Sequence, residues 1–401
     1  MKKYIKRLYY QKKIEPYINK NLIKVIIGQR RVGKSYFLYQ LMDYIKEQNS
    51  RTNIIFINKE FHEFDEIRNY KDLIEYIDSK KMPNEKNYIF IDEIQDIEQF
   101  EKALRHYFAK GKYDIYCSGS NAKLLSGELA TFLSGRYIEI KIYGLSYREF
   151  LKFHKLQNEN KSLTKYIKFG GLPYLINLDL TTEIVYPYLM NVYNTIVLKD
   201  IVARYQLRDV PFLEKLVKYL SNNVGSIVSA RKISDFLKSQ KISKSTNIVL
   251  NYLHYLVSAF FVFKVSRYDI LGKKMFEIGE KYYFEDLGIR HAIIGYSQKD
   301  INKILENLVF IHLSILGYEI MVGKSDKKEI DFVCTKNNKK LYIQVTYIIP
   351  NEKVWHREFD NLAEIKDNYK KIVISMDEII GEQYEGIEHY HILDFLNNFN
   401  E

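Results

Sequence analysis

Cysteine is scarce in this sequence, which has only two, Cys117 and Cys334, among 401 residues. Two thiols cannot build a disulfide framework, and they cannot supply the four thiolates of a structural zinc site. We therefore expect a protein of a reducing compartment. Because no histidine lies near Cys334 in the sequence to act as a base, a packing role is favoured over nucleophilic catalysis.

Long hydrophobic runs are also missing. The longest apolar stretch lies around residues 256–263 and is interrupted by Ser258, whereas a helix needs about 20 apolar residues to span a bilayer. The chain starts with the basic sequence MKKYIKRLYYQKK, and no apolar segment typical of a signal peptide follows it. We expect a cytoplasmic protein without a membrane partner. Six prolines also argue against proline-rich linkers, so the domains should pack closely.

The remaining composition is that of a basic globular protein. Hydrophobic residues make up 46% and charged residues 28%, which argues against an intrinsically disordered chain. At roughly 100–200 residues per domain, the length predicts two to four domains. Lysine and arginine number 61 against 50 acidic residues, so the net charge is +11. This excess favours a polyanionic partner such as nucleic acid.

A phosphate-binding loop is predicted near the N-terminus. Residues 22–27, LIKVII, are typical of a buried strand, and GQRRVGKS follows directly, before a segment with helical periodicity. Glycines let backbone N–H groups approach phosphate oxygens, and the helix N-terminus adds a positive dipole end. We expect Lys34 beside the β- and γ-phosphates of ATP and the Ser35 hydroxyl on Mg²⁺. The predicted nucleotide-binding residues are Gly28, Gln29, Arg30, Arg31, Val32, Gly33, Lys34, Ser35 and Tyr36.

The second half of such a site is expected in residues 88–93, YIFIDE, an apolar run that ends in two acids. Asp92 at the strand end would hold Mg²⁺, and Glu93 would orient or deprotonate the attacking water. A glutamate in this place favours hydrolysis over binding alone. The loop and the two acids together predict an ATPase with ATP and Mg²⁺ as cofactors.

Two further positions are candidates for contacts with the γ-phosphate. The segment YDIYCSGSN at residues 113–121 predicts a third strand, and Ser120 or Asn121 at its end would sense that phosphate, with a simple turn as the alternative. Arg136 follows Gly135 in an expected loop. Its guanidinium could reach the γ-phosphate of its own or of a neighbouring subunit, where an arginine contributes about 10³–10⁵ in rate. A surface or structural role of Arg136 is the alternative.

The order of these motifs resembles a widespread family of prokaryotic AAA-type P-loop ATPases, related to archaeal and STAND-like ATPases, that carry a C-terminal domain of unknown function. The resemblance rests on GQRRVGKS, FIDEIQDI, CSGSNAKLLSGELATFLSGRY and IKIYGLSYREFL, and later segments extend it over nearly the whole chain. The segment GGLPY at residues 170–174 is similar to a Gly-x-Pro element of the family. The resemblance implies that Pro173 packs near the adenine, and a helix stop is the alternative.

The middle of the chain predicts a helical lid and a winged helix. Residues 1–150 are expected to form the ATPase core, and the helical patterns in residues 151–205 its lid. In residues 206–290, two helices at ARKISDFLKSQ and KSTNIVLNYLHYLVSAF flank a short turn, and an alternating segment around Gly272 predicts a β-hairpin. In winged helices that bind DNA, the second helix enters the major groove.

Charge in this region favours DNA as a partner. Between Ser226 and Lys274, nine basic residues stand against two acidic residues. Phosphate neutralisation on this scale predicts binding that is sensitive to salt and largely independent of sequence. The alternative is a winged helix that serves only domain packing or subunit contact. The candidate DNA contacts are Arg231, Lys241, Lys244, Thr246, Asn247 and Lys273.

Residues 291–401 resemble a restriction-endonuclease-like α/β domain of the PD-(D/E)xK type that has lost its activity. We expect an amphipathic helix over residues 301–317 that carries Glu306, and a strand that carries Asp331. Gln344 and Thr346 stand where the glutamate and lysine of an E-x-K motif would be. A neutral amide is a poor Mg²⁺ ligand, so cleavage should be absent or nearly so. Glu306 and Asp331 would then be structural acids or remnants in a binding surface for DNA or a partner.

The sequence thus predicts an α/β fold with an AAA-like P-loop NTPase core, whose parallel sheet carries helices on both faces, followed by the lid, the winged helix and the nuclease-like domain. The leading hypothesis is Mg²⁺-dependent ATP hydrolysis coupled to DNA binding or remodelling, in a homo-oligomer. The first alternative is a nucleotide-controlled switch or scaffold that acts on a protein partner through the C-terminal domain. An ATP-regulated nuclease is the weaker alternative.

Overall fold

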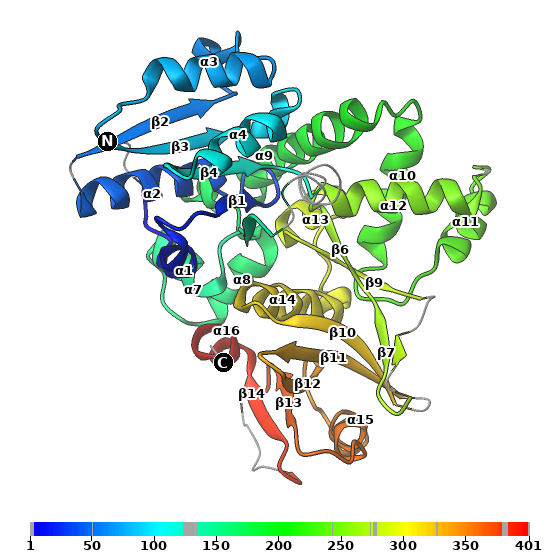
Figure 1. The fold of residues 1–401 in the computed structure, drawn as a ribbon. Helices are drawn as coiled ribbons and strands as arrows, with labels where there is room; N and C mark the ends of the chain where they lie inside the picture. Colours follow the sequence, from blue (N-terminus) through cyan, green and yellow to red (C-terminus); the bar gives the residue numbers. More distant parts are fainter. Residues whose placement is uncertain are drawn as a thin grey trace. The chain divides into compact units, whose positions relative to one another are not determined.

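A computed structural model of the chain describes residues 4–49, 51–122, 133, 135–242, 244–272, 274–275, 279–325, 328–378 and 384–399 (Figure 1). The chain divides into two compact units. The first unit comprises Met1–Tyr143 together with Ser258–Phe260, and the second comprises Gly144–Val257 and Phe261–Glu401. Within the described ranges, no helix has the length and apolar character that crossing a membrane requires.

The first unit is built on a five-stranded parallel sheet with the strand order β2-β3-β4-β1-β5, which confirms the predicted parallel core. All five side chains of β1 are buried, as expected for a strand that is covered on both faces. Lys24 within β1 is tolerated there because it forms a buried ion pair with Asp114 on β4. The strands are β1 (Ile23–Ile27), β2 (Thr52–Asn58), β3 (Lys86–Asp92), β4 (Tyr113–Gly119) and β5 (Tyr137–Lys141).

The helices of the first unit connect these strands. Helix α2 packs against β2, β3 and β4, and α1 packs against β5. Because all five strands are parallel, their carboxyl ends share one edge of the sheet, where Ile27 of β1 pairs with Gly119 of β4 and Asp92 ends β3. The phosphate loop therefore begins at the same edge as the predicted acids. The helices are α1 (Leu8–Ile14), α2 (Lys34–Gln48), α3 (Tyr70–Lys80) and α4 (Phe100–Lys110).

The second unit begins with a helical region. Its helices α11 and α12 are the two helices of the predicted helix-turn-helix region. Helix α9 contains Pro187 and continues as a π-helix over Ile196–Ala203. The helices are α7 (Tyr147–His154), α8 (Asn160–Phe169), α9 (Thr182–Thr195), α10 (Val210–Asn222), α11 (Ala230–Ser239), α12 (Thr246–Ser258) and α13 (Leu287–Ile294).

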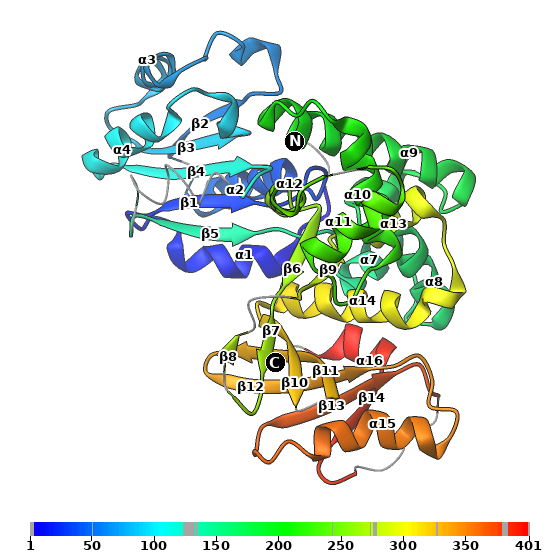
Figure 2. The ribbon, with the colours of Figure 1, turned by 90° about the vertical axis from the view of Figure 1, so that its right-hand side faces the viewer.

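The rest of the second unit is a seven-stranded sheet with the order β14-β13-β12-β11-β10-β7-β8. Helices α14 (Ile301–Leu316) and α15 (Glu352–Ala363) lie on opposite faces of this sheet (Figure 2), and α16 (Ile392–Asn398) follows the last strand. Phe359 and Leu362 of α15 belong to a buried cluster with Ile330, Val333 and Val373 of the strands. The strands are β7 (Arg267–Asp269), β8 (Lys274–Met275), β10 (Glu319–Ser325), β11 (Lys328–Lys336), β12 (Lys339–Val345), β13 (Lys370–Ser375) and β14 (Glu388–His391).

The predicted β-hairpin after α12 divides between two sheets. Its base is the antiparallel pair β6 (Val262–Val265) and β9 (Lys281–Phe284). Its outer part, β7 and β8, joins the seven-stranded sheet, because β7 pairs in parallel with β10. The predicted hairpin and the C-terminal sheet are thus connected by main-chain hydrogen bonds, and the winged helix itself stays a prediction.

Helix α14 differs from its predicted amphipathic character. All its residues except Asn302, Lys303 and Ser314 are buried. The reason is that α14 is surrounded, since it packs against β9, β10, β12 and α13. A helix that is covered on all sides is apolar all round. Glu306 therefore lies in the interior of the unit, and only Asn302, Lys303 and Ser314 are left for the polar side of the predicted amphipathic helix.

We predict that Gly28→Ala destabilises the first unit much more than Gly111→Ala. A Cβ on Gly28 would lie 2.1 Å from the carbonyl oxygen of Ile142, whereas a Cβ on Gly111 meets no atom within 4 Å. Both residues have positive φ, a conformation that side chains rarely adopt, so both variants carry backbone strain of about 1–3 kcal/mol. Steric overlap should cost Gly28→Ala about 1–3 kcal/mol more, measured by thermal unfolding. Equal losses of stability would contradict the close approach.

Candidate nucleotide-binding site

The loop between β1 and α2 has the backbone conformation of an anion-binding nest. Gly28, Arg31 and Gly33 have positive φ angles of 154°, 71° and 97°. Gly33 is the N-cap of α2, so the helix N-terminus opens directly from the loop. Left-handed residues beside right-handed ones turn successive N–H groups toward one point, which suits a phosphate group.

Other residues of the first unit hold this loop in place through hydrogen bonds to its main chain. Arg7, which is buried and precedes α1, donates to the carbonyl oxygens of Val32 at 3.1 Å and Tyr143 at 2.8 Å. The amide of Ile142 donates to the carbonyl of Ile27 at 2.7 Å. The loop is thus attached to the segment after β5. The sequence motif contained no signal for Arg7.

Lys34 lies at the start of α2 with only 4% of its side chain exposed. Its Nζ donates to the carbonyl oxygens of Gly28 at 3.1 Å and Gln29 at 3.0 Å. The same Nζ lies 3.8 Å from Oε1 of Glu93. The ammonium therefore joins the loop to the end of β3.

Asp92 ends β3 and is fully buried. Its carboxylate accepts hydrogen bonds from the hydroxyls of Ser118 and Ser35, and from the amide of Asn58 at 3.3 Å. Burial raises the pKa of Asp92, although these hydroxyls and Lys34 act in the opposite direction. The Ser35 hydroxyl and the Asp92 carboxylate are both oxygen donors of the kind that Mg²⁺ prefers.

Glu93 follows with a positive φ of 54°, which turns its side chain out of the strand direction. Its carboxylate accepts hydrogen bonds from Gln95 and Ser120. Burial alone would raise the pKa of Glu93, but Lys34, Arg30 and these two hydrogen bonds lower it below the usual value. Glu93 is therefore expected to be ionised at neutral pH, although only 5% of its surface is exposed to solvent. Strained backbone at a buried, charged residue is typical of functional sites.

Comparison with known proteins then gives the family. Residues 20–151 match a family described as an AAA domain. A protein of Haemophilus influenzae, called only an uncharacterized protein, is 39% identical over 98% of this chain and 98% of its own length. This chain belongs to the AAA family of P-loop ATPases. The relative MJ1544 of Methanocaldococcus jannaschii, also called uncharacterized, is 31% identical over 92% of this chain and 84% of its own length.

The part of the chain after the AAA domain has its own match. Residues 160–300 match a family described as a domain of unknown function (DUF8612). Among solved structures, the Walker-type ATPase PABY2304 of Pyrococcus abyssi is similar, with 16% identity and a TM-score of 0.49. That similarity covers 73% of this chain and 96% of the other.

The remaining predicted nucleotide contacts of this AAA ATPase differ in burial and in the unit to which they belong. Ser120 and Asn121 are both buried after β4, and Ser120 bonds to Glu93. Tyr36 is 54% exposed on α2, and Val32 is buried. Pro173 lies in the second unit, where it begins the 3₁₀ helix Pro173–Asn177, and its predicted contact with adenine stays a prediction.

Arg136 lies at the opposite edge of the sheet from the phosphate loop. It directly precedes β5, whose Tyr137 pairs with Ile23, while Lys141 pairs with Ile27 at the loop end of β1. Four residue steps of about 3.3 Å each separate the two edges, which is more than an arginine side chain spans. The exposed guanidinium lies 5.5 Å from the ring centre of Phe108. A contact between Arg136 and the phosphates of its own subunit is therefore disfavoured.

Of the predicted DNA contacts of the ATPase, Arg231 lies at the start of α11, Lys241 and Lys244 lie between α11 and α12, and Thr246 and Asn247 begin α12. The side chains of Arg231, Lys241, Thr246 and Asn247 are exposed, and Lys273 lies outside the described residues. Lys244 is less available, because its Nζ forms an ion pair with Asp209 at 2.6 Å. Three large apolar side chains, which the charge argument did not consider, are exposed in the same helices, namely Phe236, Ile248 and Leu250.

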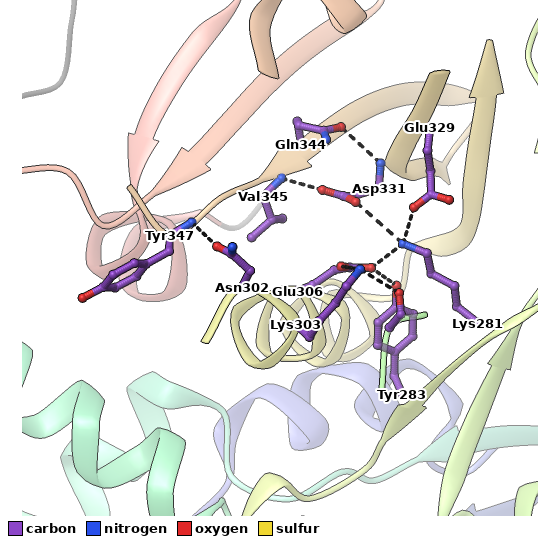
Figure 3. A network of polar contacts seen from close by, with 11 residues as sticks. Lys281, Tyr283, Asn302, Lys303, Glu306, Glu329, Asp331, Gln344, Val345 and Tyr347 are labelled. Atoms are coloured by element: carbon purple, nitrogen blue, oxygen red, sulfur yellow. Dashed lines mark hydrogen bonds and ion pairs between the residues drawn. The ribbon is translucent and has the colours of Figure 1, made fainter. Parts of the chain in front are cut away.

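The predicted nuclease-like residues do come together, but around a lysine from another element (Figure 3). Asp331 on β11 accepts a hydrogen bond from the amide of Val345 at 2.9 Å, and its own amide donates to Oε1 of Gln344 at 3.3 Å. Nζ of Lys281 on β9 lies 2.6 Å from Glu306, 2.8 Å from Glu329 and 3.7 Å from Asp331. No sequence motif indicated Lys281, which lies 50 residues before Asp331.

Charge balance explains how these acids are tolerated inside the unit. Glu306 also accepts hydrogen bonds from Tyr283 at 2.5 Å and Lys303 at 3.1 Å. Burial would lower the pKa of Lys281, but the three carboxylates raise it above its usual value, so the ammonium stays charged. Burial, followed by the charge of Glu306, raises the pKa of Asp331 to about 7. Among the described residues, no cluster of acids, histidines and cysteines suits a metal ion. Lys281 supplies the positive charge here.

We predict that Lys281→Met lowers the free energy of unfolding by about 3–5 kcal/mol, because it leaves buried carboxylates without a partner. Adding Glu306→Gln to Lys281→Met should recover part of this loss, which urea unfolding of the two single variants and the double variant would measure. Lys303→Met is the matched control, since Lys303 also contacts Glu306 but is 41% exposed, and it should cost at most about 1 kcal/mol. Additive effects of Lys281→Met and Glu306→Gln would contradict the coupling.

Proposed function

We propose that this AAA ATPase hydrolyses ATP with Mg²⁺ and couples the reaction to DNA binding or remodelling. The observation that carries the first half is the buried carboxylate of Glu93, 3.8 Å from the ammonium of Lys34 at the edge where the phosphate loop begins. A general base and a phosphate-binding cation at one strand edge are the two groups that hydrolysis of a phosphoanhydride needs.

The loop and its surroundings suit a nucleotide polyphosphate. The left-handed residues of the loop turn backbone N–H groups inward, and Gly28 leaves no room for a side chain beside Ile142. Lys34 would bind the β- and γ-phosphates, while Ser35 and Asp92 would hold Mg²⁺. The cation, when bound, neutralises negative charge on the phosphates.

Glu93 would position the attacking water and accept its proton. Its hydrogen bonds with Gln95 and Ser120 fix the direction of the carboxylate. On this account Ser120 acts first as a positioning residue for Glu93, and a contact of Ser120 with the γ-phosphate remains part of the proposal. A general base contributes about 10²–10⁴ in rate.

Arg136 would act only between subunits. Its position before β5, away from the loop edge, leaves a neighbouring copy of the chain as the only phosphate site that it could complete. The proposal therefore includes a homo-oligomer, in which Arg136 stabilises charge on the γ-phosphate of the adjacent subunit.

DNA would contact the exposed cations beside the turn between α11 and α12. Arg231 and Lys241 would bind backbone phosphates, and Thr246 and Asn247 at the start of α12 would lie nearest the groove. Lys244 contributes less on this account, because Asp209 already neutralises it. Binding should weaken steeply with salt.

The second candidate is a nucleotide-controlled switch that acts on a protein partner. Phe236, Ile248 and Leu250 favour it, because exposed apolar side chains on α11 and α12 suit a protein surface better than a polyanion. The ATP-regulated nuclease is not favoured, since Lys281 already neutralises the buried acids that would have to bind a metal ion.

We predict that DNA stimulates ATP hydrolysis several-fold and that the stimulation fades as salt rises from about 50 mM to 200 mM. The measurement is the steady-state rate of the full chain without nucleic acid and with single-stranded, duplex and branched DNA. Glu93→Gln, which keeps the size of the side chain, should lower every rate at least about 100-fold and serves as the background control. A measurable rate that no DNA changes would favour the protein-directed switch.

A further inference from the structure

We propose that Gln29 and the turn Ser258–Phe260 form a relay that transmits the nucleotide state of the phosphate loop to helix α12. The inference rests on the proposed function, because nucleotide binding at the loop is its input. It adds a route by which the input reaches the second helix of the helix-turn-helix region.

The first contact of the relay comes from inside the phosphate loop. The side chain of Gln29 is 1% exposed, and its Nε2 donates to the carbonyl oxygen of Phe260 at 3.3 Å. The backbone carbonyl of the same residue accepts a hydrogen bond from Lys34 at 3.0 Å. Gln29 therefore touches the phosphate-binding ammonium with its main chain and the turn after α12 with its side chain.

The second contact comes from the strand beside Glu93. The amide of Ala122 donates to the carbonyl oxygen of Ser258, the last residue of α12, at 2.9 Å. Ala122 follows Ser120, which bonds to Glu93, by two residues. Both segments that surround the predicted γ-phosphate position thus hold the same turn.

The turn Ser258–Phe260 is part of the first compact unit, as these contacts with Gln29 and Ala122 would require. Ser258–Phe260 belongs to the first unit, whereas the preceding residues of α12 and the following strand β6 belong to the second. Phe260 has a positive φ of 54°, which is a genuine outlier for a bulky residue. Its ring is buried, and the ammonium of Lys141 lies 5.0 Å from the ring centre. A strained conformation persists only where its surroundings determine it, so the turn is held in place by the first unit.

Lys34 makes the relay sensitive to phosphate. An ammonium has three N–H donors, and those of Lys34 are directed to the carbonyls of Gly28 and Gln29 and toward Glu93. A phosphate group that binds Lys34 must take over at least one of these donors. The relay requires that this donor is the one to the Gln29 carbonyl, so that the backbone at Gln29 loses a hydrogen bond and its side-chain contact with Phe260 shifts.

Hydrogen exchange of the full-length chain tests the relay without DNA. In Glu93→Gln, which should retain ATP, Mg²⁺-ATP is expected to change the exchange rate of the amides of Ala122 and Phe261 about fivefold or more. Phe261 reports on the end of α12, because its amide bonds to the carbonyl of Leu256. Adding Gln29→Ala or Gln29→Glu should abolish the change at Phe261, since neither side chain can donate to the carbonyl of Phe260, whereas Ala122 keeps its own hydrogen bond to Ser258.

Asn87→Ala is the matched control, because Asn87 is also a buried amide side chain of the first unit but bonds to Asn53, Met82 and Glu85 at the start of β3. It should leave the response intact. Without nucleotide, Gln29→Ala should already speed exchange at Phe261, which keeps the test valid if this variant binds ATP poorly. An unchanged rate at Ala122 and Phe261 while residues 28–35 become protected would overturn the relay, as would a response at Phe261 that survives in Gln29→Ala. No protection of residues 28–35 would instead refute the proposed nucleotide site, and the relay with it.

Discussion

The close approach of Gly28 to the carbonyl of Ile142 is the constraint on which the nucleotide site depends. It sets the distance between the phosphate loop and the segment that follows β5, and even a methyl group would overlap with that carbonyl. Arg7 holds the other side of the loop through Val32 and Tyr143. With the loop fixed in this way, Lys34 reaches Glu93 and Asp92 comes into contact with Ser35.

The chemistry of the site follows from burial combined with charge. Asp92 and Glu93 are neighbours in the chain, yet their pKa values move in opposite directions. Burial dominates at Asp92, whereas Lys34 and Arg30 outweigh it at Glu93. The adjacent carboxyl groups thus differ in how readily they ionise, without any difference in chemical type.

Much of the fold and of the candidate site could be predicted because its signals are contiguous in the sequence. A strand, a glycine-rich loop and a helix specify the phosphate loop, and an apolar run before Asp92 and Glu93 specifies the second strand end. The edge on which Arg136 lies was not predicted, because it depends on the parallel pairing of β5 with β1, and the sequence indicated only a loop around Arg136. Contacts between residues that lie far apart in the sequence had no such signal. Phe260 lies 231 residues from Gln29, and Lys281 reaches Glu306 from a strand that sequence alternation assigned to a simple hairpin.

The central claim is that the nucleotide in the first unit controls how the helix-turn-helix region binds DNA. The most direct test is the dissociation constant of a labelled duplex for Glu93→Gln with bound ATP and for the wild-type chain with bound ADP, measured by fluorescence anisotropy at one salt concentration. The account predicts that the two constants differ at least about fivefold, or roughly 1 kcal/mol. Equal dissociation constants would contradict it, because ATP hydrolysis would then leave DNA binding unchanged.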